Sequence, residues 1–133
     1  MITLRYLDVA DSLLRERPDE IAGLWPRACA WLLRLALESA VDDLWARERP
    51  AVAQTPMRAQ LLSLRYLRAL GPEPLAIAEY LWESLSRAVH HHPYELSPTA
   101  TELRRWHQDV HALALTLGSH RPEPDPTAQP ESS

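Results

Sequence analysis

The sequence contains no lysine, no phenylalanine and no asparagine, and among its 133 residues it has one cysteine and three glycines. Because Cys29 is the only cysteine, the chain can form neither an internal disulfide nor a zinc site built from cysteines. No apolar run approaches the ~18 residues that a membrane-spanning helix needs, so we expect no transmembrane segment. The N-terminal stretch carries Asp8 and Asp11 where a signal peptide keeps its apolar core, which favours a cytoplasmic protein.

The charge balance is acidic, with fourteen arginines against eighteen acidic residues and a net charge of −4. This balance argues against a protein that coats nucleic acid non-specifically, but it leaves room for a local basic pocket. The length and the 46% of hydrophobic residues fit one globular domain with a sizeable core, which we place at residues 1–118. Residues 119–133 hold four prolines and no large apolar side chain, so we expect a disordered, proline-rich tail.

Prolines divide the chain into segments with apolar residues three and four positions apart, which is typical of amphipathic helices. We expect helices over 3–17, from 19 to about 49, over 57–70, from Pro74 onward, and from Thr99 to Gly118. The first would bury Leu4, Leu7, Ala10 and Leu14, and the last Leu103, Trp106, Val110, Leu113 and Leu117. No segment alternates with the period of a strand, so the sequence predicts an all-α bundle of four to five helices.

Several residues mark helix boundaries. Pro26 predicts either a kink or the true start of the second helix, and Thr55 is a candidate cap ahead of a first-turn proline. Thr99 and Glu102 have the spacing of a capping box. Gly118 is expected to end the last helix in a left-handed conformation.

Residues 86–98, SRAVHHHPYELSP, bring together the groups that suggest chemistry. Arg87 can bind phosphate, and the three histidines at positions 90–92 can exchange protons near neutral pH. On an unbroken helix Arg87 and His92 would face ~140° apart around the axis. Because Pro93 disfavours the helical conformation of His92, we expect the helix to end at His91–His92 and His92 to turn back toward Arg87.

The run from Arg87 to Tyr94, RAVHHHPY, resembles the Arg-x4-His-x-Tyr signature of HEPN domains, in the form found in toxins of HEPN–nucleotidyltransferase toxin–antitoxin pairs. Over about residues 20–117 the chain is also similar to an actinobacterial HEPN subfamily, through the segments LWARERP, MRAQLLSL and LSRAVHHHPYELSPTATELRRW. HEPN domains are four- to five-helix bundles with this motif near the end of a late helix, so the resemblance agrees with the helices expected above.

The resemblance implies a metal-independent endoribonuclease of the toxin or defence type, which works as a homodimer on RNA and needs no cofactor. Arg87 would bind the scissile phosphate and stabilise its developing charge. His92 would act as general acid–base around a 2′-hydroxyl attack that yields a 2′,3′-cyclic phosphate. Tyr94 matches the tyrosine that a partner nucleotidyltransferase antitoxin adenylylates, and His91 is a candidate accessory residue in the cleft.

Other interpretations stay open. Active family members often carry Asn or Asp directly after the arginine, where this chain has Ala88. That departure and the net acidity favour a non-catalytic HEPN module that binds nucleotide, RNA or a partner protein. In a plain helical scaffold, the histidines would only meet the negative end of a helix dipole, and Arg87 and His92 would point to separate surfaces.

Residues outside the motif have two interpretations each. Arg104 and Arg105 could follow an RNA backbone or lie on a solvated helix face. His107 and His111, four residues apart, could complete a metal site with the histidine triplet or form the polar flank of a helix, and we predict no metal. We expect the five tryptophans to fill the core or a dimer interface rather than to stack on bases.

Overall fold

The computed structural model describes residues 2–16, 23–90 and 96–122 of the chain. Within these ranges the protein is helical and has no strand, which confirms the all-α fold class. The helices are α1 (Ile2–Glu16), α2 (Trp25–Glu48), α3 (Pro50–Ala53), α4 (Met57–Ser63), the 3-10 turns η2 (Leu64–Tyr66) and η3 (Arg68–Leu70), α5 (Pro72–Val89) and α6 (Ala100–Ser119). None of these helices is long and apolar enough to cross a membrane.

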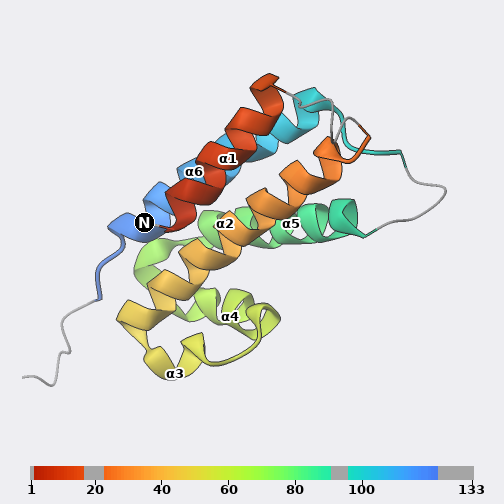
Figure 1. Cartoon of the computed structure of the whole chain (residues 1–133). Coiled ribbons are helices and arrows are strands. Elements are labelled where there is room, and N and C mark those ends of the chain that lie inside the picture. The colour runs from red at the N-terminus through yellow and green to blue at the C-terminus, as the bar shows by residue number, and fades with distance from the viewer. Residues whose placement is uncertain (1, 17–22, 91–95, 123–133) are drawn as a thin grey trace, which may run out of the picture.

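Helix α2 is the centre of the bundle, because it packs against each of the other long helices, α1, α5 and α6 (Figure 1). Helix α6 also packs along both α1 and α5, so the four long helices enclose one core. The short helices α3 and α4 pack against α2, and α4 also contacts α5. Figure 1 shows α3 and α4 at the end of the bundle where α2 finishes.

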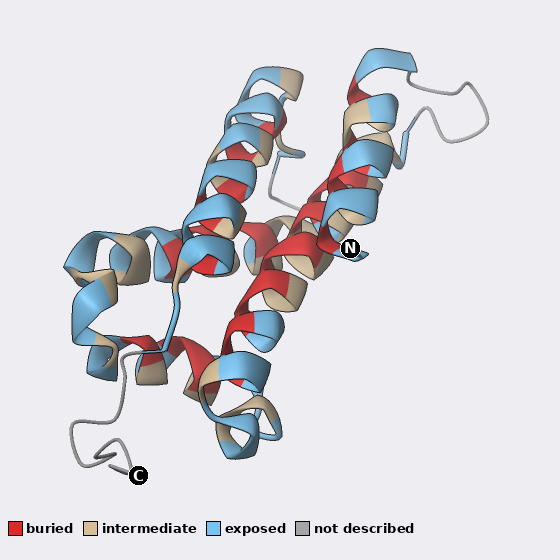
Figure 2. Cartoon of the chain, turned by 90° about the vertical axis from the view of Figure 1, so that its left-hand side faces the viewer, coloured by how far each residue is buried: buried red, intermediate tan, exposed pale blue. Residues whose placement is uncertain are grey.

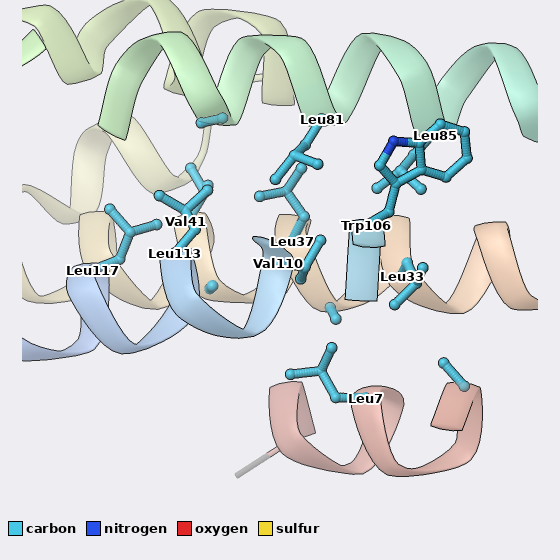
Figure 3. Close-up of a cluster of buried hydrophobic side chains, with 14 of the residues drawn as sticks. Leu7, Leu33, Leu37, Val41, Leu81, Leu85, Trp106, Val110, Leu113 and Leu117 are labelled. Carbon is cyan, nitrogen blue, oxygen red and sulfur yellow. The ribbon is translucent and has the colours of Figure 1, made fainter. Parts of the chain in front are cut away.

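The core consists mainly of leucine, valine and alanine from the inward faces of the long helices, visible as the buried stripes in Figure 2. Figure 3 shows Leu33 and Leu37 of α2 in the same cluster as Leu81 and Leu85 of α5. The same view labels Val41 of α2, Leu7 of α1 and four residues of α6: Trp106, Val110, Leu113 and Leu117. Since each fully buried leucine contributes on the order of 2 kcal/mol, this packing can hold the fold without a disulfide.

The buried stripe of α1 begins at Thr3 rather than at Leu4, so the expectation for Leu4 is wrong. Thr3 is 3% exposed, whereas Leu4 is 41% exposed. The hydroxyl of Thr3 donates a hydrogen bond to Ser39 Oγ at 2.9 Å. Because that bond satisfies the buried hydroxyl, threonine can occupy a position that an apolar residue would normally take.

Helix α2 starts at Trp25, so Pro26 marks the true start of the helix rather than a kink within it. Proline is tolerated there because the N–H groups of the first turn have no carbonyl partner within the helix. Residue 19, the expected start of this helix, lies outside the described residues. The tryptophans divide between core and surface: Trp45 and Trp106 are buried, Trp25 and Trp82 are half-buried, and Trp31 is 51% exposed.

Residues 57–70 do not form the single expected helix, because the chain passes from α4 into two 3-10 turns. Leu64, Leu67 and Leu70 face the core at intervals of three residues, with Leu64 buried and the other two partly buried. This spacing matches the three residues per turn of a 3-10 helix. Thr55 does not cap α4 as expected, since its hydroxyl donates to the carbonyl of Val52 at the end of α3 instead.

Helix α5 starts at Pro72, two residues before the expected Pro74. Gly71 precedes it with φ +83°, a left-handed conformation that glycine adopts without the steric strain of a side chain. Both prolines then lie in the first turn, where backbone N–H groups have no partner within the helix, so the missing N–H of proline costs no hydrogen bond.

Helix α6 confirms the expected capping box. The hydroxyl of Thr99 accepts from the backbone N–H of Glu102 at 3.1 Å, and the Glu102 carboxylate accepts from the backbone N–H of Thr99. The expected stop at Gly118 is wrong, because α6 continues to Ser119 and Gly71 is the only glycine with positive φ among the described residues. The chain leaves α6 at His120 in an extended conformation, and of the expected tail only residues up to 122 are described.

Candidate functional site

Arg87 lies in the last turn of α5 with its side chain exposed. It lines a shallow hollow of about 400 Å³ between the end of α5 and the start of α6. From α6 the hollow takes Glu102 and Trp106, and from α5 it takes Tyr80 and Ala88 as well as Arg87. Within the described part of the chain Arg87 forms no ion pair, so its guanidinium is free to bind an anion.

Helix α5 ends at Val89, slightly before the expected end at His91–His92. His90 has extended backbone angles of φ −77° and ψ 129°, and its N–H donates to the carbonyl of Ser86 at 3.3 Å. The chain therefore leaves the helix three residues after Arg87, before the histidine run is complete. His91, His92 and Tyr94 lie outside the described residues, so their predicted roles stay predictions.

The charges on the hollow are mixed. Arg87 is its one basic side chain and Glu102 its one acidic side chain among the described residues that line it. Glu102 Oε1 accepts from the backbone N–H and the hydroxyl of Thr99, so its carboxylate is held in the capping box. The N-terminal end of the α6 dipole points toward this hollow and partly offsets that negative charge.

Ala88 packs against the edge of the core and also lines the hollow. Its methyl group gives Arg87 no polar neighbour at this position. Ser86, one position before Arg87, is half-buried, and its hydroxyl has no hydrogen-bond partner among the described residues. The described surroundings of Arg87 therefore supply no side chain that fixes the guanidinium in one orientation.

Arg104 and Arg105 are exposed on α6 and line a different shallow hollow, together with Thr101 and Gln108. Neither arginine lines the hollow of Arg87. The fold thus places these two candidate RNA-binding residues on another face of α6.

His107 and His111 do not form a pair in the structure. His107 Nε2 lies 3.0 Å from the carbonyl oxygen of Leu7, which ties α6 to α1, whereas His111 is exposed. No three His, Cys, Asp or Glu side chains in residues 2–16, 23–90 and 96–122 come together in a group that could hold a metal ion.

Cys29 is fully buried, and its thiol lies 3.8 Å from the carbonyl oxygen of Ala10. Burial raises the pKa of the thiol to about 11, although the charge of Arg104 acts in the opposite direction. A thiol of this kind stays protonated and unreactive at neutral pH, so Cys29 belongs to the core and not to a catalytic site.

A separate hollow, which the sequence did not predict, lies near the opposite end of α5 from Arg87, and we call it the Arg49–Arg68 hollow. It has a volume of about 570 Å³ and is lined by Arg49, Arg68 and His120. Arg49 follows α2, Arg68 begins η3 and His120 follows α6. Because these residues are far apart in the sequence, no motif or spacing could have identified them.

Comparisons of the chain with models of known protein families, with curated proteins and with solved structures find no match.

Proposed function

We propose that this chain is a HEPN-like, metal-independent endoribonuclease of the toxin or defence type that acts as a homodimer. The observation that carries the proposal is the position of Arg87, which is exposed, unpaired among the described residues and two positions before Val89, the last residue of its helix. The all-α bundle and the late helix bearing this arginine are what the HEPN resemblance implies.

The early end of α5 supports the pairing of Arg87 with His92. A continuous helix would hold these two residues ~140° apart around its axis. Because His90 is already extended, that constraint no longer applies beyond Val89. The end of α5 at Val89 therefore removes the objection that an unbroken helix would hold the two residues apart.

In the proposed reaction, Arg87 binds the scissile phosphate and stabilises the charge that develops on it. His92 removes the proton from the 2′-hydroxyl and returns a proton to the leaving 5′-oxygen, with His91 assisting. The products are a 2′,3′-cyclic phosphate and a 5′-hydroxyl. Two copies of the motif line one cleft in the homodimer, and a partner nucleotidyltransferase silences the enzyme by adenylylating Tyr94.

A second candidate function is a non-catalytic HEPN module that binds nucleotide, RNA or a partner protein. Two observations favour it. Ala88 provides no polar group beside Arg87, and Glu102 places a carboxylate in the same hollow. Both features would weaken the stabilisation of a phosphorane-like transition state more than they would weaken simple binding.

The test is cleavage of a mixed-sequence RNA by the purified full chain, with EDTA present throughout. We expect Arg87→Ala to lower the rate on the order of 10²–10³-fold, by analogy with the loss of one oxyanion donor, and His92→Ala to abolish cleavage. Arg5→Ala and His111→Ala are matched controls, because both residues are exposed and neither lines the hollow.

Cleavage that is lost in both motif variants and kept in both controls supports the nuclease. RNA binding without cleavage by the folded wild type, weakened by Arg87→Ala, supports the binding module instead. Cleavage that persists in folded Arg87→Ala and His92→Ala contradicts the assigned site.

A further inference from the structure

The Arg49–Arg68 hollow is formed where α2, η3 and the segment after α6 meet. Figure 1 shows the chain after α6 passing the end of α2. Three basic side chains line the hollow, Arg49, Arg68 and His120, against a single acid, Glu48. Tyr66, which is 79% exposed, lies on the same lining.

Glu48 and His120 form the buried part of this site. Glu48 Oε1 lies 3.0 Å from His120 Nε2, and each side chain is 9% exposed. Glu48 Oε1 has no hydrogen-bond partner among the described residues, so the approach of His120 Nε2 is a close contact without hydrogen-bond geometry. Because Glu48 occupies one ring nitrogen, His120 keeps its Nδ1 as a further donor when the ring is protonated.

The helix ends at this hollow do not block an anion. Both α2 and α6 end here, and the carbonyls at a helix C-terminus carry partial negative charge. The Trp45 carbonyl accepts from the N–H of Arg49 at 2.7 Å. The Leu117 carbonyl accepts from Arg47 Nη2 at 2.9 Å and from the N–H of His120 at 3.3 Å.

Capping therefore accounts for the Arg47 side chain and for the backbone N–H groups of Arg49 and His120, but it leaves the side chains of two arginines unexplained. Arg49 and Arg68 are exposed, both line the hollow, and neither forms an ion pair with a carboxylate in the described part of the chain. Guanidinium groups match the geometry of a phosphate and bind it through paired N–H donors. Two of them at one hollow, beside a fixed histidine, form a set of donors suited to a dianion.

We propose that this hollow binds a small phosphomonoester whose phosphate is held by Arg49 and Arg68. A volume of about 570 Å³ exceeds what inorganic phosphate fills and falls in the range of small-molecule sites. Val52 and Tyr66 line the same space and offer an apolar surface to the organic part of the ligand. This site is separate from Arg87, so the inference stands or fails independently of the proposed nuclease.

The test is calorimetric titration of the full chain with phenyl phosphate and, separately, with inorganic phosphate at constant ionic strength. We expect saturable binding by the wild type, weakened about tenfold or more by Arg49→Ala and by Arg68→Ala, since each removes a charge-assisted hydrogen-bond donor. Arg65→Ala is the matched control, because Arg65 is exposed in the neighbouring turn but does not line the hollow.

Three further variants sharpen the assignment. Tyr66→Ala should weaken phenyl phosphate and leave inorganic phosphate unchanged. Glu48→Gln should bind both anions at least as tightly as the wild type, because it removes the one acid of the lining. Arg87→Ala should bind as the wild type does, since Arg87 lines the other hollow.

The proposal is overturned if the folded wild type shows no saturable binding of phenyl phosphate or inorganic phosphate up to about 10 mM. A dissociation constant above that concentration corresponds to less than ~3 kcal/mol of binding free energy. It is also overturned if Arg65→Ala weakens binding as much as Arg49→Ala does, because the effect would then reflect net charge alone. Loss of binding in Arg87→Ala with retention in Arg49→Ala and Arg68→Ala would move the anion to the other hollow.

Discussion

The buried thiol of Cys29 predicts a specific loss of stability in alkali. The pKa of this thiol rises from its ordinary value of 9.0 to about 11 because burial disfavours the charged thiolate. In the folded state the protonated thiol also lies 3.8 Å from the Ala10 carbonyl oxygen, to which a thiolate could not donate. The unfolded chain therefore releases this proton at a lower pH than the folded protein does.

The sign of the effect follows from proton linkage. Between pH 9 and pH 11 the unfolded state has lost the proton and the folded state still binds it, so the free energy of unfolding falls as pH rises. The difference of about two pH units between the two pKa values corresponds to about 3 kcal/mol, of which about 2 kcal/mol is lost by pH 11. Below pH 9 the contribution is fully present.

The assay is urea denaturation followed by circular dichroism at intervals from pH 8 to pH 11, for the wild type and Cys29→Ala. All other titratable groups are common to both proteins, so their effects cancel in the difference between the two curves. We expect the wild type to lose about 2 kcal/mol more than Cys29→Ala between pH 8 and pH 11. Arg104→Ala should deepen the loss, because the charge of Arg104 lowers the pKa of the thiol.

The reasoning is refuted if the wild type and Cys29→Ala lose stability in parallel over this range. A constant offset between the two curves would not matter, since it measures only the packing of the sulfur. The informative quantity is the difference between their slopes.

Four substitutions test the fold itself by chemical denaturation. Gly71→Ala should destabilise the protein by about 1–3 kcal/mol, because alanine is strained at φ +83° even though its side chain meets no clash. Gly118→Ala, inside α6, should stabilise the protein by about 0.5–1 kcal/mol. Equal effects of the two substitutions would refute the backbone conformations assigned to these glycines. Thr99→Ala should cost about 1 kcal/mol by removing the capping box, and no change would mean that α6 does not depend on it. Leu33→Ala, at a fully buried position, should cost about 2–5 kcal/mol, and a loss below 1 kcal/mol would place Leu33 outside the core.

Local signals predicted the parts of the fold that depend on neighbouring residues. The capping box of Thr99 and Glu102 needs only four consecutive residues, and the buried stripe of α6 follows from one helical period. The stretch that contains Leu64 and Leu67 was ambiguous, because a spacing of three fits both an α-helix and a 3-10 turn. Its course depends on the packing of η2 against α4 and α5, which no short window contains.

The glycines show the same limit. Gly118 stands where a helix could end, but the helix continues to Ser119 and the chain then runs extended to the contact of His120 with Glu48. That contact joins residues 72 positions apart, so tertiary structure decides the helix end. Of the candidate site, the sequence predicted the position of Arg87 near a helix end, but not the presence of Glu102 in its hollow.

The chemistry of the RNA ends left by the purified chain in EDTA would show whether the 2′-hydroxyl attacks the scissile phosphate. We expect 2′,3′-cyclic phosphate and 5′-hydroxyl ends, and no cleavage of a substrate whose scissile nucleotide lacks the 2′-hydroxyl. Ends with 5′-phosphate and 3′-hydroxyl, or cleavage of the deoxy substrate, would contradict the proposed attack by the 2′-hydroxyl and with it the roles of Arg87 and His92.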